Sequence, residues 1–315
     1  MIFRPLGATG INCSIIGLGT GRLASVSGGI SRSGAGALLG VAEDLGINLI
    51  DTADSYAQGE CEKRIGVALQ GRRGKFIVTT KAGYCFSALG GGLRLIKPLA
   101  KRVLKYFKSG KNLASSVRSN VARQEFSSEA IRGCLEASLR RLQTDYVDIF
   151  LLHSPPAAVM ADERLFELLR QFQKEGKLRH FGVSSPDATV LESALKINGL
   201  AVVQTPVNPA QPNHLSLLPK LQAAKIGVVA NQIFLSGKLL PRGKNAEEKE
   251  FSDLKTKLAS LAAKKRISLN RLLIEHALAQ PGVVSVLTGT TKLEHLKQNV
   301  ADALAPAVLS AGEMP

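Results

Sequence analysis

Short apolar, β-rich runs alternate with helical patterns along the whole 315-residue chain, and this alternation limits the possible folds more than any other feature. Strand–helix repeats build parallel sheets, whose strands are covered on both faces and therefore read as near-continuous apolar runs. Eight such units favour a closed barrel over an open doubly wound sheet. We therefore predict an α/β fold, a single (β/α)8 TIM barrel over residues 1–315, although length alone would also allow two smaller domains. The predicted strands are Ile15–Gly19, Asn48–Asp51, Phe76–Thr80, Val147–His153, His180–Ser184, Ala201–Gln204, Gly227–Ala230 and Val283–Leu287.

Local signals at the ends of the predicted helices agree with this pattern. Ser127 precedes an apolar series at helical spacing, and Asp162 is placed to cap a second helix. Thr291 and Glu294 have the spacing of a capping box at the start of the last clear helix. The opening residues 3–11 predict a small β-hairpin in front of the first barrel strand.

Composition excludes several other classes of protein. The four cysteines, at 13, 61, 85 and 134, form no C-x-x-C pair, so neither a zinc ribbon nor a redox dithiol is indicated, and we expect no metal site. The first residues lack the apolar core of a secretory signal, and no apolar run approaches the roughly 18 residues of a membrane span. We therefore expect a cytoplasmic protein without a transmembrane segment.

Chemically active side chains follow three neighbouring strands of the predicted barrel. Asp51 ends the second strand and Tyr56 follows it closely, Lys81 comes directly after the third, and His153 ends the fourth. In this fold the chemistry lies at the carboxyl ends of the strands. A phenol can donate a proton, a neighbouring ammonium favours phenolate, a carboxylate holds that ammonium charged, and an imidazole can bind a substrate oxygen.

Each of these side chains alone has an ordinary structural explanation. A single Asp at a strand end usually caps a turn, a single Lys is usually solvated, and a Tyr or a His is more often part of the packing. Their occurrence together at strand ends, in this order, favours a catalytic site that protonates a carbonyl oxygen while hydride reaches its carbon.

A long basic segment interrupts the barrel pattern just after Lys81. Residues 84–124 contain no acid, and nine basic residues lie between 94 and 123; without them the net charge of +16 falls to +7. This distribution disfavours a nucleic-acid-binding protein and indicates one basic insertion at the rim of the site. We weigh an anionic substrate, an acidic partner or a closing lid against a solvated basic amphipathic helix near Pro98, or contact with a membrane surface.

Three motifs together resemble the aldo-keto reductase superfamily, in particular its bacterial members and the related potassium-channel beta subunits. The stretch Gly46–Tyr56 is similar to the family signature around its catalytic Asp and Tyr, Val78–Lys81 matches its lysine motif, and Asp145–Pro155 matches its histidine motif. The resemblance runs from Leu6 to Asn299. It implies hydride transfer from a nicotinamide, with Tyr56 as general acid or base, Lys81 and Asp51 tuning it, and His153 orienting the carbonyl.

The resemblance also implies a cofactor site, with NADP(H) preferred and NAD(H) as the alternative. Ser185 stands where relatives more often have Asn, and Asn231 where an aromatic often stacks on the nicotinamide. Lys292 and His295 stand near the usual arginine and favour a cofactor with a 2′-phosphate, although lysine lacks the arginine fork. The implied cofactor-binding residues are Gly19, Thr20, Gly21, Asp51, Ser184, Ser185, Gln204, Phe234, Ser236, Gly237, Gly289, Thr290, Thr291, Lys292, His295, Gln298 and Asn299.

Alternatives to a carbonyl reductase stay open at this point. A sugar or lactone-forming dehydrogenase shares the fold and the four catalytic side chains, and a cofactor-binding regulatory subunit is not excluded by them. A different β/α-barrel enzyme would need a metal cluster or a pair of rim carboxylates, which the sequence lacks. We expect a small carbonyl or alcohol substrate, anionic if the basic segment contacts it, and no nucleic-acid partner; the oligomeric state is not legible.

Overall fold

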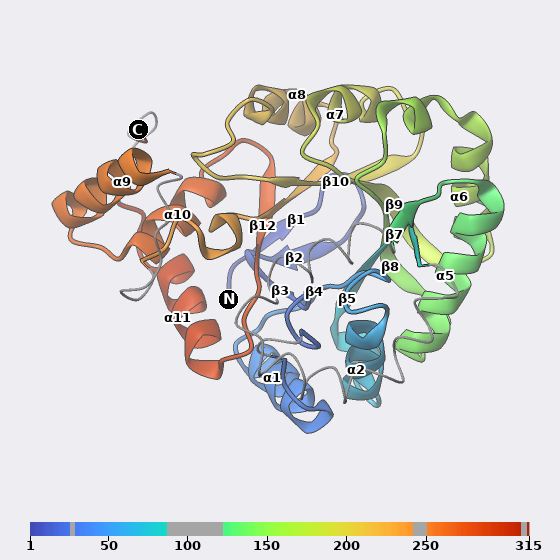
Figure 1. The fold of residues 1–315 in the computed structure, drawn as a ribbon, viewed down its shortest axis with the longest axis horizontal. Coiled ribbons are helices and arrows are strands. Elements are labelled where there is room, and N and C mark those ends of the chain that lie inside the picture. The colour runs from blue at the N-terminus through green and yellow to red at the C-terminus, as the bar shows by residue number, and fades with distance from the viewer. Residues whose placement is uncertain (26–28, 87–121, 242–250, 310–313, 315) are drawn as a thin grey trace, which may run out of the picture.

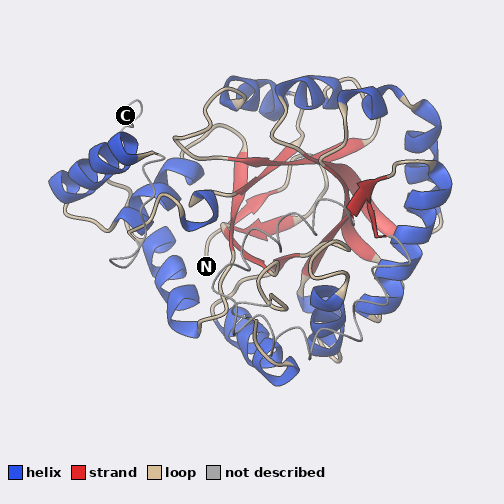
Figure 2. Ribbon diagram, viewed as in Figure 1, coloured by secondary structure: helices blue, strands red, loops and turns tan. Residues whose placement is uncertain are grey.

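Eight parallel strands close into a barrel surrounded by helices, as the sequence predicts (Figures 1 and 2). The computed structural model describes residues 1–25, 29–86, 122–241, 251–309 and 314. The barrel strands follow one another in chain order around the ring. They are β3 (Ile16–Gly19), β4 (Leu49–Asp51), β5 (Ile77–Ala82), β8 (Val147–His153), β9 (Leu178–Ser184), β10 (Leu200–Pro206), β11 (Gly227–Asn231) and β12 (Val283–Thr288).

Every predicted strand overlaps an observed one, and the largest differences are at the ends. The strand β9 begins two residues before the predicted start, and β10 runs two residues past Gln204. The strand β5 continues through Lys81, which the sequence reading placed just after it. A lysine normally marks the end of a buried strand, but Lys81 stays inside because its charge has buried partners.

Helices in the described part of the chain cover the outside of the barrel (Figure 2). Ser127 and Asp162 cap their helices through side-chain oxygens, as predicted. The capping box at Thr291 was wrong. Lys292 is the N-cap and makes no side-chain cap bond, because its ammonium carries no acceptor, while the Thr290 hydroxyl accepts from the Lys292 amide in the preceding turn. The helices are α1 (Arg32–Asp44), α2 (Glu60–Leu69), α5 (Ser128–Leu142), α6 (Glu163–Lys174), α7 (Ala188–Ala194), α8 (Leu218–Ala223), α9 (Ser252–Lys265), α10 (Leu269–Leu278) and α11 (Leu293–Leu304).

An N-terminal hairpin of β1 (Phe3–Pro5) and β2 (Asn12–Ser14) closes the amino-terminal end of the barrel. Its Leu6 and Cys13 are fully buried in the same apolar cluster as Leu49, Ile149 and other inward-facing strand residues. The amino-terminal end of the barrel interior is therefore filled by apolar side chains.

The helices α9 and α10 pack on a small apolar core of their own, at one side of the ring (Figure 1). The C-terminal segment is fastened to this unit by the buried Glu275, whose carboxylate accepts from the amides of Val308 at 3.0 Å and Leu309 at 3.3 Å. Arg271 donates to the Pro306 carbonyl at 2.5 Å. The segment therefore acts as a strap across the two helices.

The two ends of the basic insertion pair as antiparallel strands, β6 (Tyr84–Phe86) and β7 (Ala122–Gln124). The Gln124 amide donates to the Ser154 carbonyl, which ties this base to the end of β8. Most of the basic residues, and the amphipathic helix expected near Pro98, lie outside the described residues. Among the helices that are described, none is both long and apolar enough to span a membrane.

A buried polar cluster lies between the strands β4 and β5 and the helices α2 and α5. The carboxylate of Glu62, which is fully buried, accepts from Thr80 Oγ1 and from Arg141 Nε, both at 2.6 Å. Asp54 lies beside them with its Oδ1 buried and without a partner among the described atoms. Burial, reinforced by the charge of Glu62, raises the pKa of Asp54 to about 7.

This raised pKa predicts a pH-dependent effect of Asp54→Asn on stability. Between the ordinary carboxyl pKa and 7 the folded state binds more protons at this site than the unfolded state, so this group destabilises the fold progressively as pH rises. We take the free energy of unfolding of the variant minus that of wild type, measured by urea unfolding. This difference should be about 2 kcal/mol larger at pH 8 than at pH 5. Asp145→Asn, at an exposed aspartate, is the control, and an equal pH response of the two variants would contradict the assignment.

Candidate active site

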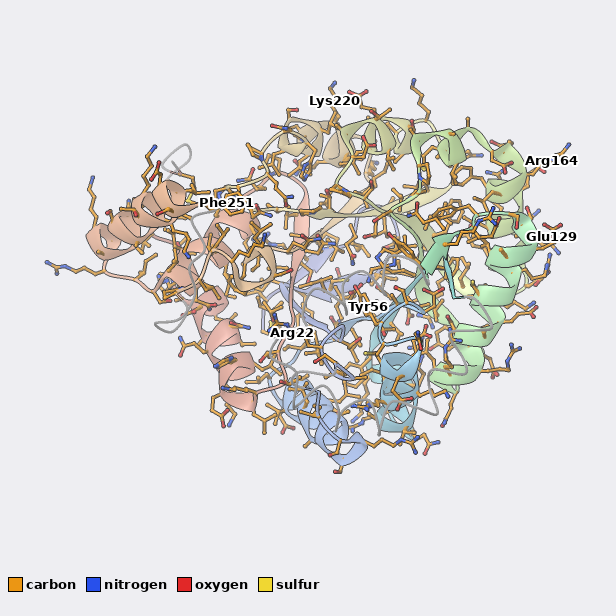
Figure 3. All side chains as sticks on the ribbon, viewed as in Figure 1. Arg22, Tyr56, Glu129, Arg164, Lys220 and Phe251 are labelled. Carbon is orange, nitrogen blue, oxygen red and sulfur yellow. The ribbon has the colours of Figure 1, made fainter. Side chains whose placement is uncertain are left out.

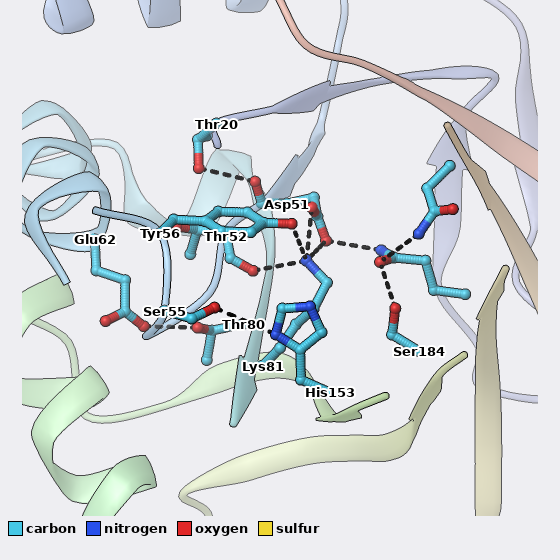
Figure 4. A network of polar contacts seen from close by, with 12 residues as sticks. Thr20, Asp51, Thr52, Ser55, Tyr56, Glu62, Thr80, Lys81, His153 and Ser184 are labelled. Atoms are coloured by element: carbon cyan, nitrogen blue, oxygen red, sulfur yellow. Dashed lines mark hydrogen bonds and ion pairs between the residues drawn. The ribbon is translucent and has the colours of Figure 1, made fainter. Parts of the chain in front are cut away.

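The four side chains expected to carry chemistry come together at the carboxyl end of the barrel (Figure 4). Asp51 is the last residue of β4, Tyr56 lies in the turn that follows it, Lys81 lies in β5, and His153 is the last residue of β8. These are neighbouring strands, because β4 pairs with β5 and β5 pairs with β8. Tyr56 lies toward the middle of the ring, whereas Glu129, Arg164 and Lys220 project from the outer helices (Figure 3).

Lys81 is the centre of this arrangement. Its side chain is 1% exposed, and its ammonium donates to Asp51 at 2.7 Å, to the Thr52 carbonyl at 2.9 Å and to the Tyr56 hydroxyl at 3.2 Å. Burial works against the charge, but the Asp51 carboxylate outweighs it, so the pKa of Lys81 is raised above its ordinary value. The ammonium therefore keeps its charge at neutral pH, with all three of its donors used.

Tyr56 receives opposing influences from its surroundings. Burial raises the pKa of the phenol, while the Lys81 ammonium lowers it, and the net shift is upward. The phenol thus keeps its proton at neutral pH, and the cation that would stabilise the phenolate already contacts its oxygen. The arrangement can donate a proton into the cavity and hold the resulting anion.

His153 is a neutral imidazole. Burial, together with the charge of Lys81, lowers its pKa to about 3. Its Nδ1 lies 3.3 Å from the Ser55 hydroxyl, and the rings of Tyr84 and Tyr56 meet it edge-on, with centroids at 5.0 and 6.1 Å. A neutral ring can form a hydrogen bond with a ligand oxygen without adding charge to the site.

A second polar network extends from Asp51 across the barrel. Gln204 donates to Asp51 Oδ1 at 2.7 Å, an oxygen that Lys81 also contacts, and its own oxygen accepts from Ser184 at 3.0 Å and from Asn231 at 3.2 Å. Asn231 Oδ1 is buried and has no partner among the described atoms. The network therefore ends in an acceptor that an amide N–H could fill.

A cavity of about 960 Å³ connects these groups to the far side of the barrel mouth. Tyr56 and His153 line it, and so do all the expected cofactor-binding residues except Thr20. The Thr20 side chain is fully buried and donates to the Asp51 carbonyl at 2.9 Å, so it supports the strand end and does not reach the cavity. Lys81 also lies behind the lining, and it reaches the cavity only through Tyr56 and Asp51.

Several residues that line the cavity were not among those expected from the sequence. Arg22, exposed beside Gly21, donates to the Ser236 carbonyl at 3.4 Å and so bridges two walls of the cavity. Ser268 and Asn270 enter from the start of α10, where Asn270 donates to Asn299 at 3.1 Å. The charge pattern could have suggested Arg22, but the contribution of α10 depends on a tertiary contact that no local motif encodes.

These side chains fit a nicotinamide dinucleotide. The orphaned Asn231 oxygen, near Ser184 and Gln204, suits the carboxamide of the base. Arg22 and Lys292 add two cations to the lining of the cavity, which suit the phosphates of such a ligand. The size of the cavity is at the upper end of the range usual for ligand sites, which suits an extended ligand.

Comparison with known proteins agrees with this geometry. The model of the Aldo/keto reductase family matches residues 15–314. L-galactose dehydrogenase of Arabidopsis thaliana is 28% identical over 312 residues, covering 95% of this chain and 86% of that protein. The NADH-specific methylglyoxal reductase of Escherichia coli (strain K12) is 28% identical over 320 residues, covering 94% of this chain and 92% of that protein. The solved holo form of aldo-keto reductase AKR11C1 from Bacillus halodurans superposes with a TM-score of 0.79 at 25% identity, covering 98% of this chain and 93% of that chain.

With the family match extending over nearly the whole chain, and the barrel and its polar centre in agreement with it, this protein belongs to the aldo/keto reductase family of oxidoreductases.

Proposed function

We propose that this protein reduces an aldehyde or ketone to an alcohol, or catalyses the reverse oxidation, with NADP(H) as cofactor and Tyr56 as general acid or base. The observation that carries the proposal is the buried Lys81 ammonium, which is held by Asp51 and donates to Tyr56, a phenol that lines the cavity together with His153. The nicotinamide, when bound, supplies the hydride chemistry. The protein supplies the proton and the orientation of the substrate.

The direction of the hydrogen bond supports Tyr56 as the acid. Because Lys81 donates to the phenol oxygen, the phenol proton is available to an acceptor in the cavity. As the proton leaves, the ammonium stabilises the phenolate that forms, and no residue has to move. His153, neutral and also lining the cavity, would orient the same carbonyl oxygen.

The cofactor would lie along the cavity from Ser184 to Asn299. Ser184, Ser185, Gln204 and Asn231 would hold the carboxamide. The middle would rest against Phe234, Ser236 and Gly237, and the adenosine end against Gly289, Thr290, Thr291, His295, Gln298 and Asn299. Lys292 stands at the cavity wall and would meet a 2′-phosphate, which is the basis for preferring NADP(H) over NAD(H).

A sugar or lactone-forming dehydrogenase is the second candidate, because the relative from Arabidopsis thaliana is named for oxidising a sugar. The same groups would serve in reverse, with Lys81 favouring the phenolate that takes the proton from the alcohol. A panel of aldehydes, ketones and aldoses assayed in both directions separates the two candidates.

Replacing Tyr56 with Phe should abolish turnover while leaving cofactor binding intact. Loss of the general acid should lower kcat by about 100-fold or more, with para-nitrobenzaldehyde and NADPH as substrates. NADPH affinity, measured by calorimetry, should stay within about threefold, because the ring is retained.

Tyr146→Phe is the matched control, since that ring is stacked between Arg73 and Arg179 and away from the cavity. Retention of full activity in Tyr56→Phe would exclude this residue as the acid. Binding of NADPH without turnover of any panel substrate would instead favour a regulatory subunit.

Replacing Lys292 with Ala should weaken NADPH and not NADH. Loss of one charge-assisted contact to the 2′-phosphate should raise the Kd for NADPH about tenfold, with NADH unchanged. Lys297→Ala is the control, because Lys297 is exposed on the same helix and does not line the cavity. Equal effects on the two cofactors would place the 2′-phosphate elsewhere.

A further inference from the structure

The tautomer of His153 is a separate question from its charge. A neutral imidazole has one nitrogen that donates and one that accepts. A carbonyl oxygen that gains negative charge is helped only by a donor, so the nitrogen that faces the ligand must carry the proton. The structure places one nitrogen, Nδ1, against Ser55. With Nδ1 committed there, Nε2 is the ring nitrogen left for a ligand in the cavity that His153 lines.

Only one neighbour in the described part of the chain can distinguish the two tautomers. The rings of Tyr56 and Tyr84 meet His153 edge-on and restrain its plane, but their contacts to it are ring contacts and carry no hydrogen bond. Lys81, whose charge acts on His153, has all three protons engaged by Asp51, Thr52 and Tyr56. The Ser55 hydroxyl is the remaining polar contact, at 3.3 Å (Figure 4).

Counting donors and acceptors decides the direction of this bond. A serine hydroxyl has one proton and can also accept. If His153 Nδ1–H donated to Ser55, the Ser55 proton would have no acceptor among the described residues, and the bare Nε2 would offer a carbonyl nothing to bind. If Ser55 donates to Nδ1, the Ser55 proton has an acceptor and the Nε2 proton of His153 is available to a ligand. The half-buried hydroxyl is then not left without a partner.

We propose that Ser55 is a positioning residue that fixes His153 as the Nε2–H tautomer by donating its hydroxyl proton to Nδ1. Ser55 directly precedes Tyr56 in the same turn, so one short segment sets both the proton donor and the hydrogen-bond donor that meet the substrate oxygen. The use of this tautomer rests on the proposed reductase function, whereas the tautomer itself is a property of the free protein.

The test is the side-chain ¹⁵N spectrum of the full-length protein labelled at histidine, which distinguishes protonated from bare ring nitrogens. The chain has five histidines, and His153→Gln identifies the signals of His153 by their loss. Wild type should show a bare Nδ1 and a protonated Nε2 at neutral pH. Ser55→Ala should move both signals toward a mixture of tautomers, and Ser55→Thr, which keeps the hydroxyl, should restore them.

Activity provides the second measurement. Ser55→Ala should lower kcat for carbonyl reduction about five- to tenfold, the rate equivalent of one neutral hydrogen bond, with NADPH affinity unchanged. Ser55→Thr should recover most of this loss. Ser193→Ala, which removes an exposed hydroxyl bonded only to its own helix, is the control and should match wild type in both measurements.

A protonated Nδ1 in wild type, or His153 signals that do not move in Ser55→Ala, would overturn the proposal. A bare Nδ1 in a protein that turns over no carbonyl would instead uphold the tautomer and refute the proposed function. The spectrum therefore tests the tautomer and the assay tests the proposed function, and either claim can fail without the other.

Discussion

The buried ion pair between Lys81 and Asp51 is the interaction on which the rest of the site depends. A charge as deeply buried as this ammonium is tolerated only with an opposite charge and full hydrogen bonding. The barrel provides both, since β4 and β5 are adjacent and in register, and the backbone of Thr52 and the Tyr56 phenol take the remaining donors. Gln204 also donates to the Asp51 carboxylate, and its own oxygen in turn accepts from Ser184 and Asn231. The side of the cavity that holds the Tyr56 phenol and the side that holds Ser184 and Asn231 thus share one carboxylate.

The two ends of the barrel differ in what fills them. The hairpin fills the amino-terminal end with apolar side chains such as Leu6 and Cys13, whereas the ion pair lies at the carboxyl end. Another buried carboxylate on the barrel wall, Asp148, is held by Arg73 and Arg179, whose guanidinium groups also stack on Tyr146. The ion pair of Lys81 and Asp51 differs from this one in that its carboxylate lines a cavity.

The sequence predicted the barrel, the order of its strands and the meeting of Asp51, Tyr56, Lys81 and His153, because periodicity and strand-end position are local signals. It placed Lys81 outside its strand and Thr20 in the cavity, because neither a buried partner nor an inward-turned hydroxyl is visible in a linear pattern. The capping box failed because α11 begins one residue later than expected, with Lys292 at the cap position in place of Thr291. Arg22, Asn270 and Ser55 became candidates only when distant segments were placed together.

The strap that Glu275 fastens across α9 and α10 has a consequence for how this site can change over evolution. Ser268 and Asn270, which line the outer wall of the cavity, lie at the start of α10, and α10 packs on the small core that it shares with α9 through Leu272 and Leu273 as well as on the main core. Substitutions at the start of α10 can therefore reshape this wall while the hydrogen bonds that hold Tyr56 and Lys81 stay as they are. The wall and the polar centre can thus change largely independently of each other during evolution.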